Sequence, residues 1–291
     1  MGHRPESIFG TIFLSLFENR MYIHSMPMSP LISAMTAAAR AAGKGLLNDR
    51  ARLETLTVHS KAGAADMFTE ADLRAEATVR EQLLTHAPDF GFLGEEGGLV
   101  PGRDTDYVWI VDPLDGTTNF LTGSPLFAVN IALAKGGEAI AGVTYVPAME
   151  ELFWAEAGSG AWLGDRRIRI SSRATLEESV LGVGIPFATK DRHEQFYAEM
   201  ERLTRRVTGI RRLGAGAIDM AWVACGRHDA YWEQSVSAWD MAAGVAIVRE
   251  AGGLVTDTRG GALDLMNGTV LASTPAIQTQ LLEALTPVEN G

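Results

Sequence analysis

The chain has 291 residues, of which 46% are hydrophobic and 21% charged, a composition typical of a globular protein with an ample core. The excess of acidic residues, 36 against 25 basic ones, gives a net charge of −11 and argues against nucleic-acid binding through bulk charge. A single cysteine, Cys225, excludes an intramolecular disulfide and a cysteine-based zinc cluster. No two of the six histidines stand at the spacing of metal ligands on a helix, so oxygen ligands are expected for any metal.

The first 28 residues are set apart from the rest of the chain. Residues 8–17 form an apolar run that is too short to span a bilayer. Glu18 and Arg20 follow the run without a small-residue cleavage site. We interpret residues 1–28 as an N-terminal extension, which is a non-native start, a disordered segment, a peripheral helix or a signal. Residues 29–291 are expected to form one domain.

Two amphipathic helices are predicted before residue 90. Ser29 as N-cap and Pro30 as first helical residue open the first helix, which is expected to end near residues 43–45. Thr69 and Asp72 form a capping box at the start of the second helix. The apolar stripe of this second helix consists of Ala71, Ala75, Val79 and Leu83. Four charged residues fall outside the stripe: Arg74, Glu76, Arg80 and Glu81.

Two acidic residues follow a strongly predicted strand. Residues 107–111 are rich in β-branched and aromatic side chains and predict a buried strand that stops at Asp112. Asp112 and Asp115 would repel each other unless a cation lay between them, so they indicate a metal site. The simpler explanation of a lone Asp-x-x-Asp is an Asx-type turn. Residues 116–119 are small and polar, and they are suited to a helical turn whose free N–H groups bind an anion such as phosphate.

A second pair of acids, Glu95 and Glu96, follows a short strand predicted over residues 90–94. Their place at a strand end resembles that of Asp112. Nearby, residues 104–108 match the Asp-x-Asp-x-Val pattern of phosphatases that attack through an aspartate. That chemistry needs a buried strand before the first aspartate, whereas Val-Pro-Gly-Arg precedes it here, so we interpret residues 104–108 as a turn.

The next part of the chain is predicted to be all β. Five strand patterns, broken by glycine and proline turns, cover residues 126–133, 139–146, 151–155, 161–163 and 167–170. Such a meander predicts an antiparallel sheet and hence an α+β fold rather than a doubly wound repeat. Further strands are expected at residues 180–185, 209–212, 228–233, 254–256 and 270–272. Further helices are expected at residues 192–204, 214–224, 237–249 and 275–285.

Several common site motifs are excluded. The Gly214-x-Gly216 segment lacks the third glycine of a dinucleotide fingerprint, and we expect no βαβ unit around it. The chain has no P-loop, and no serine has glycine at both two-residue offsets.

Asp240 lies in the first turn of a predicted helix, where an acidic residue usually acts as a cap.

Taken together, four segments resemble the inositol monophosphatase family of magnesium-dependent, lithium-sensitive phosphatases. They are residues 61–72, Gly-Glu-Glu at 94–96, Asp-Pro-Leu-Asp-Gly-Thr-Thr-Asn-Phe at 112–120 and Trp-Asp-x-Ala-Ala-Gly at 239–244. The resemblance runs in order from about Ser29 to Leu285. It implies a layered αβαβα sandwich that is usually a cytoplasmic homodimer. We expect the partner to be a small phosphate monoester, and neither a nucleic acid nor a membrane.

The resemblance also implies roles for individual residues. The family's Mg²⁺ ligands fall on Glu95, Asp112, the Leu114 carbonyl, Asp115 and Asp240, for two or three ions per subunit. Catalytic positions fall on Asp72, Thr117 and Glu95, the first two orienting the attacking water. Substrate-contacting positions fall on Gly116, Thr117, Gly214, Ala215, Gly216 and Glu233. Glu96 and Lys61 are expected to lie beside the ligands without binding an ion.

The expected activity is hydrolysis of myo-inositol 1-phosphate or a related polyol phosphate by water that the metal activates. No protein nucleophile is required, which agrees with the lack of a serine or histidine motif. Two departures from the family pattern, Gly97 in place of serine and Thr122 in place of histidine, bear on the alcohol. Histidinol phosphate, fructose 1,6-bisphosphate and 3′-phosphoadenosine phosphate therefore stay open as substrates. A non-catalytic regulatory binding protein is the alternative from another class.

Overall fold

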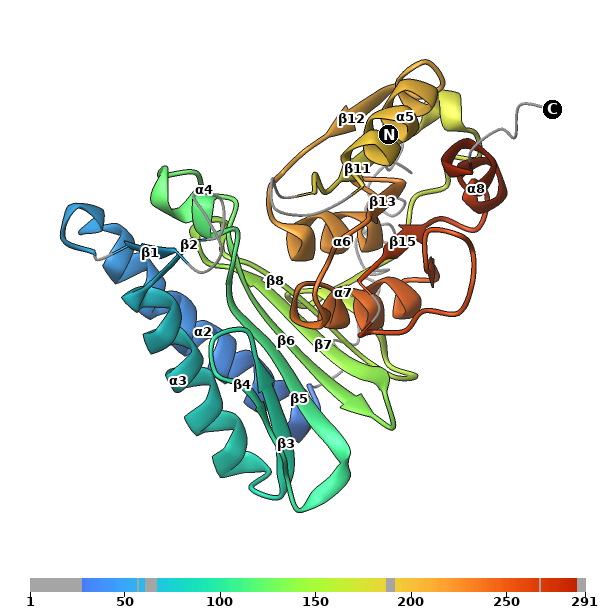
Figure 1. Cartoon of the computed structure of the whole chain (residues 1–291). Coiled ribbons are helices and arrows are strands. Elements are labelled where there is room, and N and C mark those ends of the chain that lie inside the picture. Colours follow the sequence, from blue (N-terminus) through green and yellow to red (C-terminus); the bar gives the residue numbers. More distant parts are fainter. Residues whose placement is uncertain (1–27, 57, 61–66, 187–191, 267, 287–291) are drawn as a thin grey trace, which may run out of the picture.

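Helices and sheets alternate in layers across the molecule (Figure 1). In this computed structural model of the chain, the structure describes residues 28–56, 58–60, 67–186, 192–266 and 268–286. An eight-stranded and a five-stranded sheet lie on either side of a helical layer, and further helices cover the outer face of each sheet. Three hydrophobic clusters fill the spaces between these layers. The predicted layered αβαβα sandwich is therefore confirmed.

The outer layer on one side consists of α2 (Pro30–Arg50) and α3 (Glu70–His86). Ser29 caps α2 as predicted, but the helix runs past residues 43–45, where its end was expected. Gly43 instead allows close packing, because a Cβ atom there would lie 2.7 Å from a ring carbon of Tyr145 on the sheet. The capping box of Thr69 and Asp72 at the start of α3 is confirmed.

The large sheet carries the meander that its turn pattern predicts. Its strands are β3 (Phe90–Gly94), β4 (Gly98–Val100), β5 (Asp104–Asp115), β6 (Ala128–Lys135), β7 (Glu138–Val146), β8 (Glu151–Glu156), β9 (Gly160–Leu163) and β10 (Arg166–Ile168). They are ordered β10-β9-β8-β7-β6-β5-β3-β4, and only the β3–β5 pairing is parallel among them. The described residues also include the pair β1 (Val58–Ser60) and β2 (Met67–Thr69), and the short 3-10 helices Leu53–Thr55, Pro147–Met149 and Leu176–Glu178.

Strand β5 is longer at both ends than its sequence predicts. It begins at Asp104, so the interpretation of residues 104–108 as a turn was wrong. Asp104 pairs with Phe90 of β3, and its N–H donates to the Asp89 carbonyl at 2.8 Å, which keeps this end of the strand extended. At the other end the ladder continues beyond Asp112 to Asp115, with a shift of register between them. That irregularity turns the acidic end of β5 away from regular pairing.

The middle layer consists of α6 (Gly216–Ala224) and α7 (Ala238–Glu250), which pack against each other between the sheets. Glycines permit this close approach. A Cβ atom on Gly142 of β7 would lie 2.3 Å from the Ala243 carbonyl oxygen of α7. A Cβ atom on Gly244 of α7 would lie 2.6 Å from Cβ of Met220 on α6. The small residues of the Trp-Asp-x-Ala-Ala-Gly motif thus let α7 fit between β7 and α6.

The second sheet is mixed. Its strands, in spatial order, are β12 (Gly209–Arg211), β11 (Val180–Val183), β13 (Ala230–Glu233), β15 (Val270–Ser273) and β14 (Leu254–Thr256). Helices α5 (His193–Thr204) and α8 (Gln278–Leu285) cover its outer face. Because β12 and β13 are both parallel to β11, α6 crosses over between parallel strands. The expectation of no βαβ unit around Gly214 was therefore wrong, since parallel pairing of a three-residue strand has no local sequence signal.

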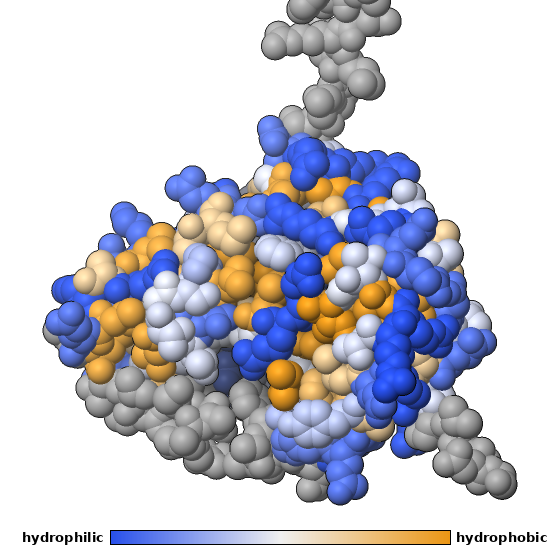
Figure 2. Space-filling view, turned by 90° about the horizontal axis from the view of Figure 1, so that it is seen from above, coloured by the Kyte–Doolittle hydropathy of each residue, from blue (hydrophilic) through white to orange (hydrophobic). Residues whose placement is uncertain are grey.

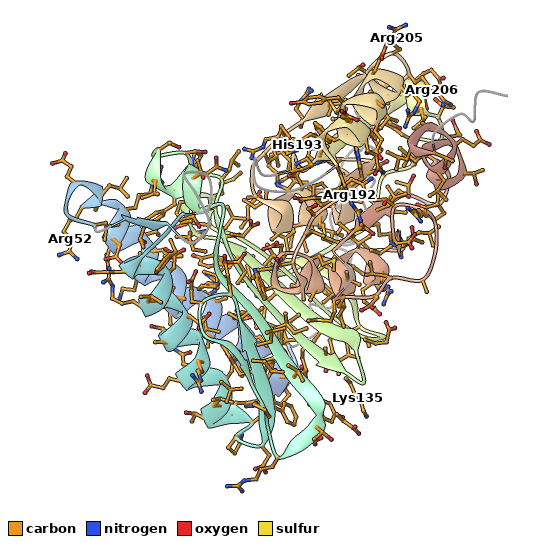
Figure 3. The ribbon with its side chains drawn as sticks, viewed as in Figure 1. Arg52, Lys135, Arg192, His193, Arg205 and Arg206 are labelled. Carbon is orange, nitrogen blue, oxygen red and sulfur yellow. The ribbon has the colours of Figure 1, made fainter. Side chains whose placement is uncertain are left out.

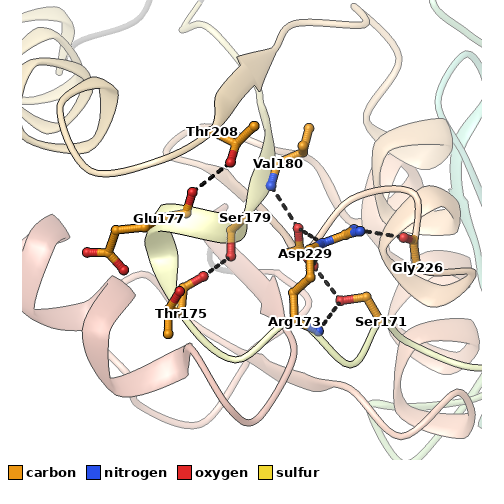
Figure 4. Close-up of polar contacts among 9 residues, drawn as sticks. All are labelled: Ser171, Arg173, Thr175, Glu177, Ser179, Val180, Thr208, Gly226 and Asp229. Carbon is orange, nitrogen blue, oxygen red and sulfur yellow. Dashed lines mark hydrogen bonds and ion pairs between the residues drawn. The ribbon is translucent and has the colours of Figure 1, made fainter.

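A buried carboxylate ties the linker between the sheets to the second sheet (Figure 4). Asp229, which is fully buried, accepts hydrogen bonds from Nε of Arg173 at 2.8 Å and from the Val180 N–H at 2.7 Å. The Ser171 hydroxyl also donates to Asp229, and Arg173 donates to the Gly226 carbonyl at 2.9 Å. These contacts fix the chain where it leaves β10 and enters β11.

The molecular surface mixes hydrophilic and hydrophobic residues on the face that Figure 2 shows. Of the labelled cations, Arg205 and Arg206 lie at the tip of α5 and Lys135 at the far end of β6 (Figure 3). Arg52 lies just after the end of α2. Within the described part of the chain, no helix combines the length and the apolar character needed to cross a membrane.

Candidate active site

Asp112 and Asp115 lie at the end of β5, in the interior of the protein. Their exposed fractions are 1% and 9%. Burial, followed by the charges of Glu95, Asp115 and Asp240, holds the pKa of Asp112 well above its usual range. The pKa of Asp115 is raised in the same way, by burial and then by Asp240. These acids are therefore near enough to repel one another strongly.

Each of the two aspartates has one oxygen held by a backbone N–H group. The Leu114 N–H donates to Oδ1 of Asp112 at 2.9 Å, and the Ala217 N–H donates to Oδ2 of Asp115 at 2.8 Å. The second oxygens, Oδ2 of Asp112 and Oδ1 of Asp115, accept no hydrogen bond from the described residues. One carboxylate oxygen of each residue is thus oriented and the other is available for a ligand.

Glu95 follows β3 directly and lies beside the end of β5. Its N–H donates to the Val111 carbonyl at 3.1 Å, one residue before Asp112. Parallel pairing of β3 and β5 therefore places Glu95 next to Asp112. The adjacent Glu96 contributes to the raised pKa of Asp72, whose main cause is burial.

Asp240 is the third residue of α7 and forms a capping box with Ser237, whose N–H donates to Oδ2 of Asp240 at 2.9 Å. The backbone of this turn is held to the large sheet by Asn130, which lies directly opposite Asp112 on β6. Nδ2 of Asn130 donates to the carbonyls of Trp239 at 2.7 Å and Asp240 at 3.2 Å. The side chain of Asn130 is itself oriented by the Thr144 hydroxyl at 2.7 Å.

Asp72, Thr117 and Leu114 meet at the start of two helices. Asp72 accepts hydrogen bonds from the N–H and the hydroxyl of Thr69 at 2.8 and 2.7 Å. Oγ1 of Thr117, the first residue of α4 (Thr117–Leu121), lies 3.4 Å from Oδ1 of Asp72 and 3.1 Å from the Leu114 carbonyl oxygen. The threonine hydroxyl thus links the buried Asp72 to the backbone of the acidic turn.

The turn at Gly116 packs against the start of α6. Gly116 has φ +86°, in the left-handed region that favours glycine, and a Cβ atom there would lie 3.3 Å from the Gly214 carbonyl oxygen. Asn119 joins the two segments, since its Nδ2 donates to the carbonyls of Leu126 at 2.7 Å and Leu213 at 2.8 Å. Gly214, Ala215 and Gly216 therefore lie beside the acidic turn.

Glu233 ends β13 on the other side of the start of α6. The Tyr231 hydroxyl donates a hydrogen bond to Glu233, and a Cβ atom on Gly216 would lie 2.8 Å from that hydroxyl oxygen. The charge of Glu233 contributes to the raised pKa of Asp115. Asp219 on α6 belongs to the same group of acids, because its pKa is raised mainly by burial and then by the charge of Asp115.

The chemistry of the donor groups fits a hard divalent cation. Mg²⁺ prefers oxygen ligands and takes one or two carboxylates per ion. The charges of Glu95 and Asp240 act on the buried Asp112 and Asp115, and a cation would relieve the repulsion among these four carboxylates. Among the described residues, no three His, Cys, Asp or Glu side chains are already arranged as a complete ligand set.

The structure brings the predicted site residues together from both halves of the chain, apart from Lys61, which lies outside the described residues. Three residues that the sequence reasoning missed hold this arrangement: Glu76, Asn119 and Asn130. Glu76 falls outside the apolar stripe of α3, yet its exposed fraction is 7%. Its signal was its position one helical turn after Asp72, on the same face. Asn119 lies within the motif at residues 112–120. No local sequence pattern marks Asn130 as part of the site.

The chain is similar to known proteins in sequence and in fold. The model of the inositol monophosphatase family matches residues 27–289. A Caulobacter vibrioides protein named inositol-1-monophosphatase is 49% identical over 254 residues, which cover 86% of this chain and 99% of that protein. The Nus factor SuhB of Pseudomonas aeruginosa is 41% identical over 264 residues, with coverages of 89% and 97%. The crystal structure of the extragenic suppressor protein suhB from Bartonella henselae has a TM-score of 0.85 at 44% identity, and the match covers 90% of this chain and 100% of that one.

The fold and the acidic site thus define a layered α+β protein of a phosphatase class. The chain belongs to the inositol monophosphatase family. Membership supports hydrolysis of a small phosphate monoester, and the family is metal-dependent.

Proposed function

We propose that the chain is a Mg²⁺-dependent phosphomonoesterase that hydrolyses myo-inositol 1-phosphate, or a related polyol phosphate, to the alcohol and inorganic phosphate. The observation that carries this proposal is the group of acids at the end of β5: Asp112 and Asp115 are buried, and burial together with the charges of Glu95 and Asp240 raises their pKa values. Relatives named inositol-1-monophosphatase, such as the Caulobacter protein, support the substrate class.

Mg²⁺ would be held by Glu95, Asp112, the Leu114 carbonyl, Asp115 and Asp240, as two or three ions per subunit. When bound, Mg²⁺ lowers the pKa of water and stabilises the charge that develops on the leaving oxygen. The N–H groups of Leu114, Ala217 and Ser237 hold one carboxylate oxygen each of Asp112, Asp115 and Asp240, respectively. Because these groups are already in position, the reaction does not lose entropy in bringing them together.

Asp72 and Thr117 would orient the attacking water. The Thr117 hydroxyl donates its proton toward Asp72 or the Leu114 carbonyl, so its lone pairs are free to accept from water. Burial raises the pKa of Asp72, which makes this carboxylate a better proton acceptor near neutral pH. A water held between these two groups would have its proton directed to Asp72 and its lone pair toward phosphorus.

Substrate would lie between the turn at Gly116 and the start of α6. The backbone N–H groups of Gly116 and Thr117 are the proposed donors to the phosphate. Gly214, Ala215 and Gly216 are the proposed lining of the polyol side. Glu233, at the end of β13, is the proposed acceptor for a substrate hydroxyl.

The test is phosphate release from a panel of myo-inositol 1-phosphate, histidinol phosphate, fructose 1,6-bisphosphate and 3′-phosphoadenosine phosphate. We expect the highest kcat/KM for the inositol ester, loss of activity in EDTA, recovery with Mg²⁺ and inhibition by Li⁺. A higher kcat/KM for another ester would change the substrate but keep the chemistry. Activity that persists in EDTA would contradict the Mg²⁺-dependent mechanism.

A non-catalytic regulatory protein is the second candidate, because relatives at 41% and 39% identity carry the name Nus factor SuhB. In that case the fold and acidic site would serve binding to a partner. A folded protein that binds Mg²⁺ and releases no phosphate from any ester of the panel would favour this candidate.

We further propose a cytoplasmic homodimer, on the basis of the family resemblance. Light scattering of the purified chain tests the dimer.

A further inference from the structure

Glu76 on α3 is a buried carboxylate that accepts hydrogen bonds from the loop that follows β3. Its exposed fraction is 7%. Oε2 of Glu76 accepts from the Glu96 N–H at 2.9 Å, and Oε1 accepts from the Gly97 N–H at 2.8 Å. Both oxygens of this carboxylate therefore bind consecutive backbone N–H groups.

The loop that Glu76 contacts carries the proposed metal ligand Glu95. It joins β3 to β4, which pair at Gly94 and Gly98. The Glu95 N–H is held by the Val111 carbonyl of β5 at 3.1 Å. Together with the two N–H groups held by Glu76, all three N–H groups of residues 95–97 have fixed acceptors. The loop is thus fastened on one side to the strand of Asp112 and on the other side to α3.

Glycines on this loop make room for the carboxylate. A Cβ atom on Gly94 would lie 2.3 Å from Oε2 of Glu76 and 2.5 Å from its carboxylate carbon. A Cβ atom on Gly97 would lie 2.7 Å from Oε1. Glycine at these two positions lets Glu76 approach the backbone closely, which explains the Gly-Glu-Glu-Gly pattern in physical terms.

We propose that Glu76 is a positioning residue that holds Glu95 in place for Mg²⁺ binding. Glu76 follows Asp72 by one helical turn, so the same face of α3 carries the residue proposed to orient water and the residue that holds the ligand loop. The inference deepens the proposed function and rests on it. Helix α3 then sets the position of Glu95 relative to Asp72.

A carboxylate is required because two donors must be accepted at once. Glutamine at position 76 is nearly isosteric but has a single acceptor oxygen, and its NH₂ group would face a backbone N–H. One N–H of the loop would then lose its acceptor. Changes to groups that support metal ligands typically weaken metal affinity by about tenfold to a hundredfold. We expect a weakening of this size for Glu76→Gln.

The experiment measures Mg²⁺ binding by isothermal titration calorimetry for the full-length wild type, Glu76→Gln and the control Glu81→Gln. Glu81 lies on the same helix with its side chain exposed, so the control removes the same charge without touching the loop. We expect Kd to rise at least about tenfold for Glu76→Gln and to stay within about twofold for Glu81→Gln. At saturating Mg²⁺ the kcat of Glu76→Gln should return to within a few-fold of the wild type.

An unchanged Kd for Glu76→Gln beside a wild type that binds Mg²⁺ would overturn this inference alone. A wild type without Mg²⁺ uptake would overturn the proposed function as well. A kcat that stays low with an unchanged Kd would also contradict a positioning role. Hydrogen exchange on the metal-free wild type is an independent measurement that needs no variant: we expect slow exchange of the Glu96 and Gly97 amides, and fast exchange would overturn the inference.

Discussion

Asp112 is the residue at which metal binding and folding oppose each other. It is buried beside three other acids, so its charged form destabilises the metal-free protein, whereas the proposed Mg²⁺ site uses that charged form as a ligand. We expect Asp112→Asn to lower kcat/KM at least about a hundredfold, because it removes that ligand. We also expect the metal-free variant to be more stable than the wild type, by about 1 kcal/mol or more, because one buried charge is lost. Phosphate release and urea unfolding in EDTA measure the two effects.

The matched control is Asp106→Asn, which makes the same change at an exposed position of the same strand. Its activity should stay within about twofold of the wild type, and its free energy of unfolding within about 0.5 kcal/mol. An Asp112→Asn variant with nearly wild-type activity at saturating Mg²⁺ would refute the ligand assignment.

At the scale of elements, the contact between β7 and α7 sets the position of Asp240. A Cβ atom on Gly142 would lie 2.3 Å from the Ala243 carbonyl oxygen, so Gly142→Ala must push α7 away from the sheet. We expect this variant to lose about 1–3 kcal/mol of stability. It should also bind Mg²⁺ more weakly, because Asp240 moves with its helix. Thermal unfolding and calorimetry test both effects.

Gly45→Ala on α2 is the control for this prediction. A Cβ atom there meets no atom within 4 Å, and the residue lies inside a helix. Alanine is the better helix former by about 1 kcal/mol, so this variant should be stabilised and should bind Mg²⁺ as the wild type does. Equal stability losses for the two variants would show that the glycine effect is unrelated to α7.

At the scale of the whole molecule, stability should depend on pH and Mg²⁺ together. Raised pKa values mean that the folded protein holds protons on Asp112 and Asp115 more tightly than the unfolded chain does. This contribution to stability is complete below the usual aspartate pKa and is lost as the pH rises through the folded values. In the proposed function Mg²⁺ binds the deprotonated form, which would add about 2.7 kcal/mol at a concentration of 100 times Kd.

The Tm increase caused by Mg²⁺ should therefore grow as the pH rises above the usual aspartate pKa. Differential scanning calorimetry with 10 mM Mg²⁺ or EDTA measures it at each pH. Asp112→Asn should reduce the increase, since the variant lacks a ligand. A Tm increase that is constant over this pH range would contradict proton release on metal binding.

Much of the molecule could be predicted because its signals are local. Capping boxes mark Asp72, and turn residues mark the meander of the large sheet. The positions of Glu76 and Asn130 could not be predicted from the residues alone, because burial of a polar side chain depends on partners distant in sequence. The βαβ crossover through α6 was missed for the same reason, since only the assembled sheet shows that β12 and β13 run in the same direction.

Asn130 has a kinetic consequence for the loading of the enzyme. Asn130 lies on β6 opposite Asp112, and its uncharged side-chain amide donates hydrogen bonds to backbone carbonyls in the first turn of α7. The two halves of the polypeptide are thereby joined before any ion arrives. Uptake of Mg²⁺ should then be limited by the slow departure of water from the ion, and not by a search of the polypeptide for the right arrangement.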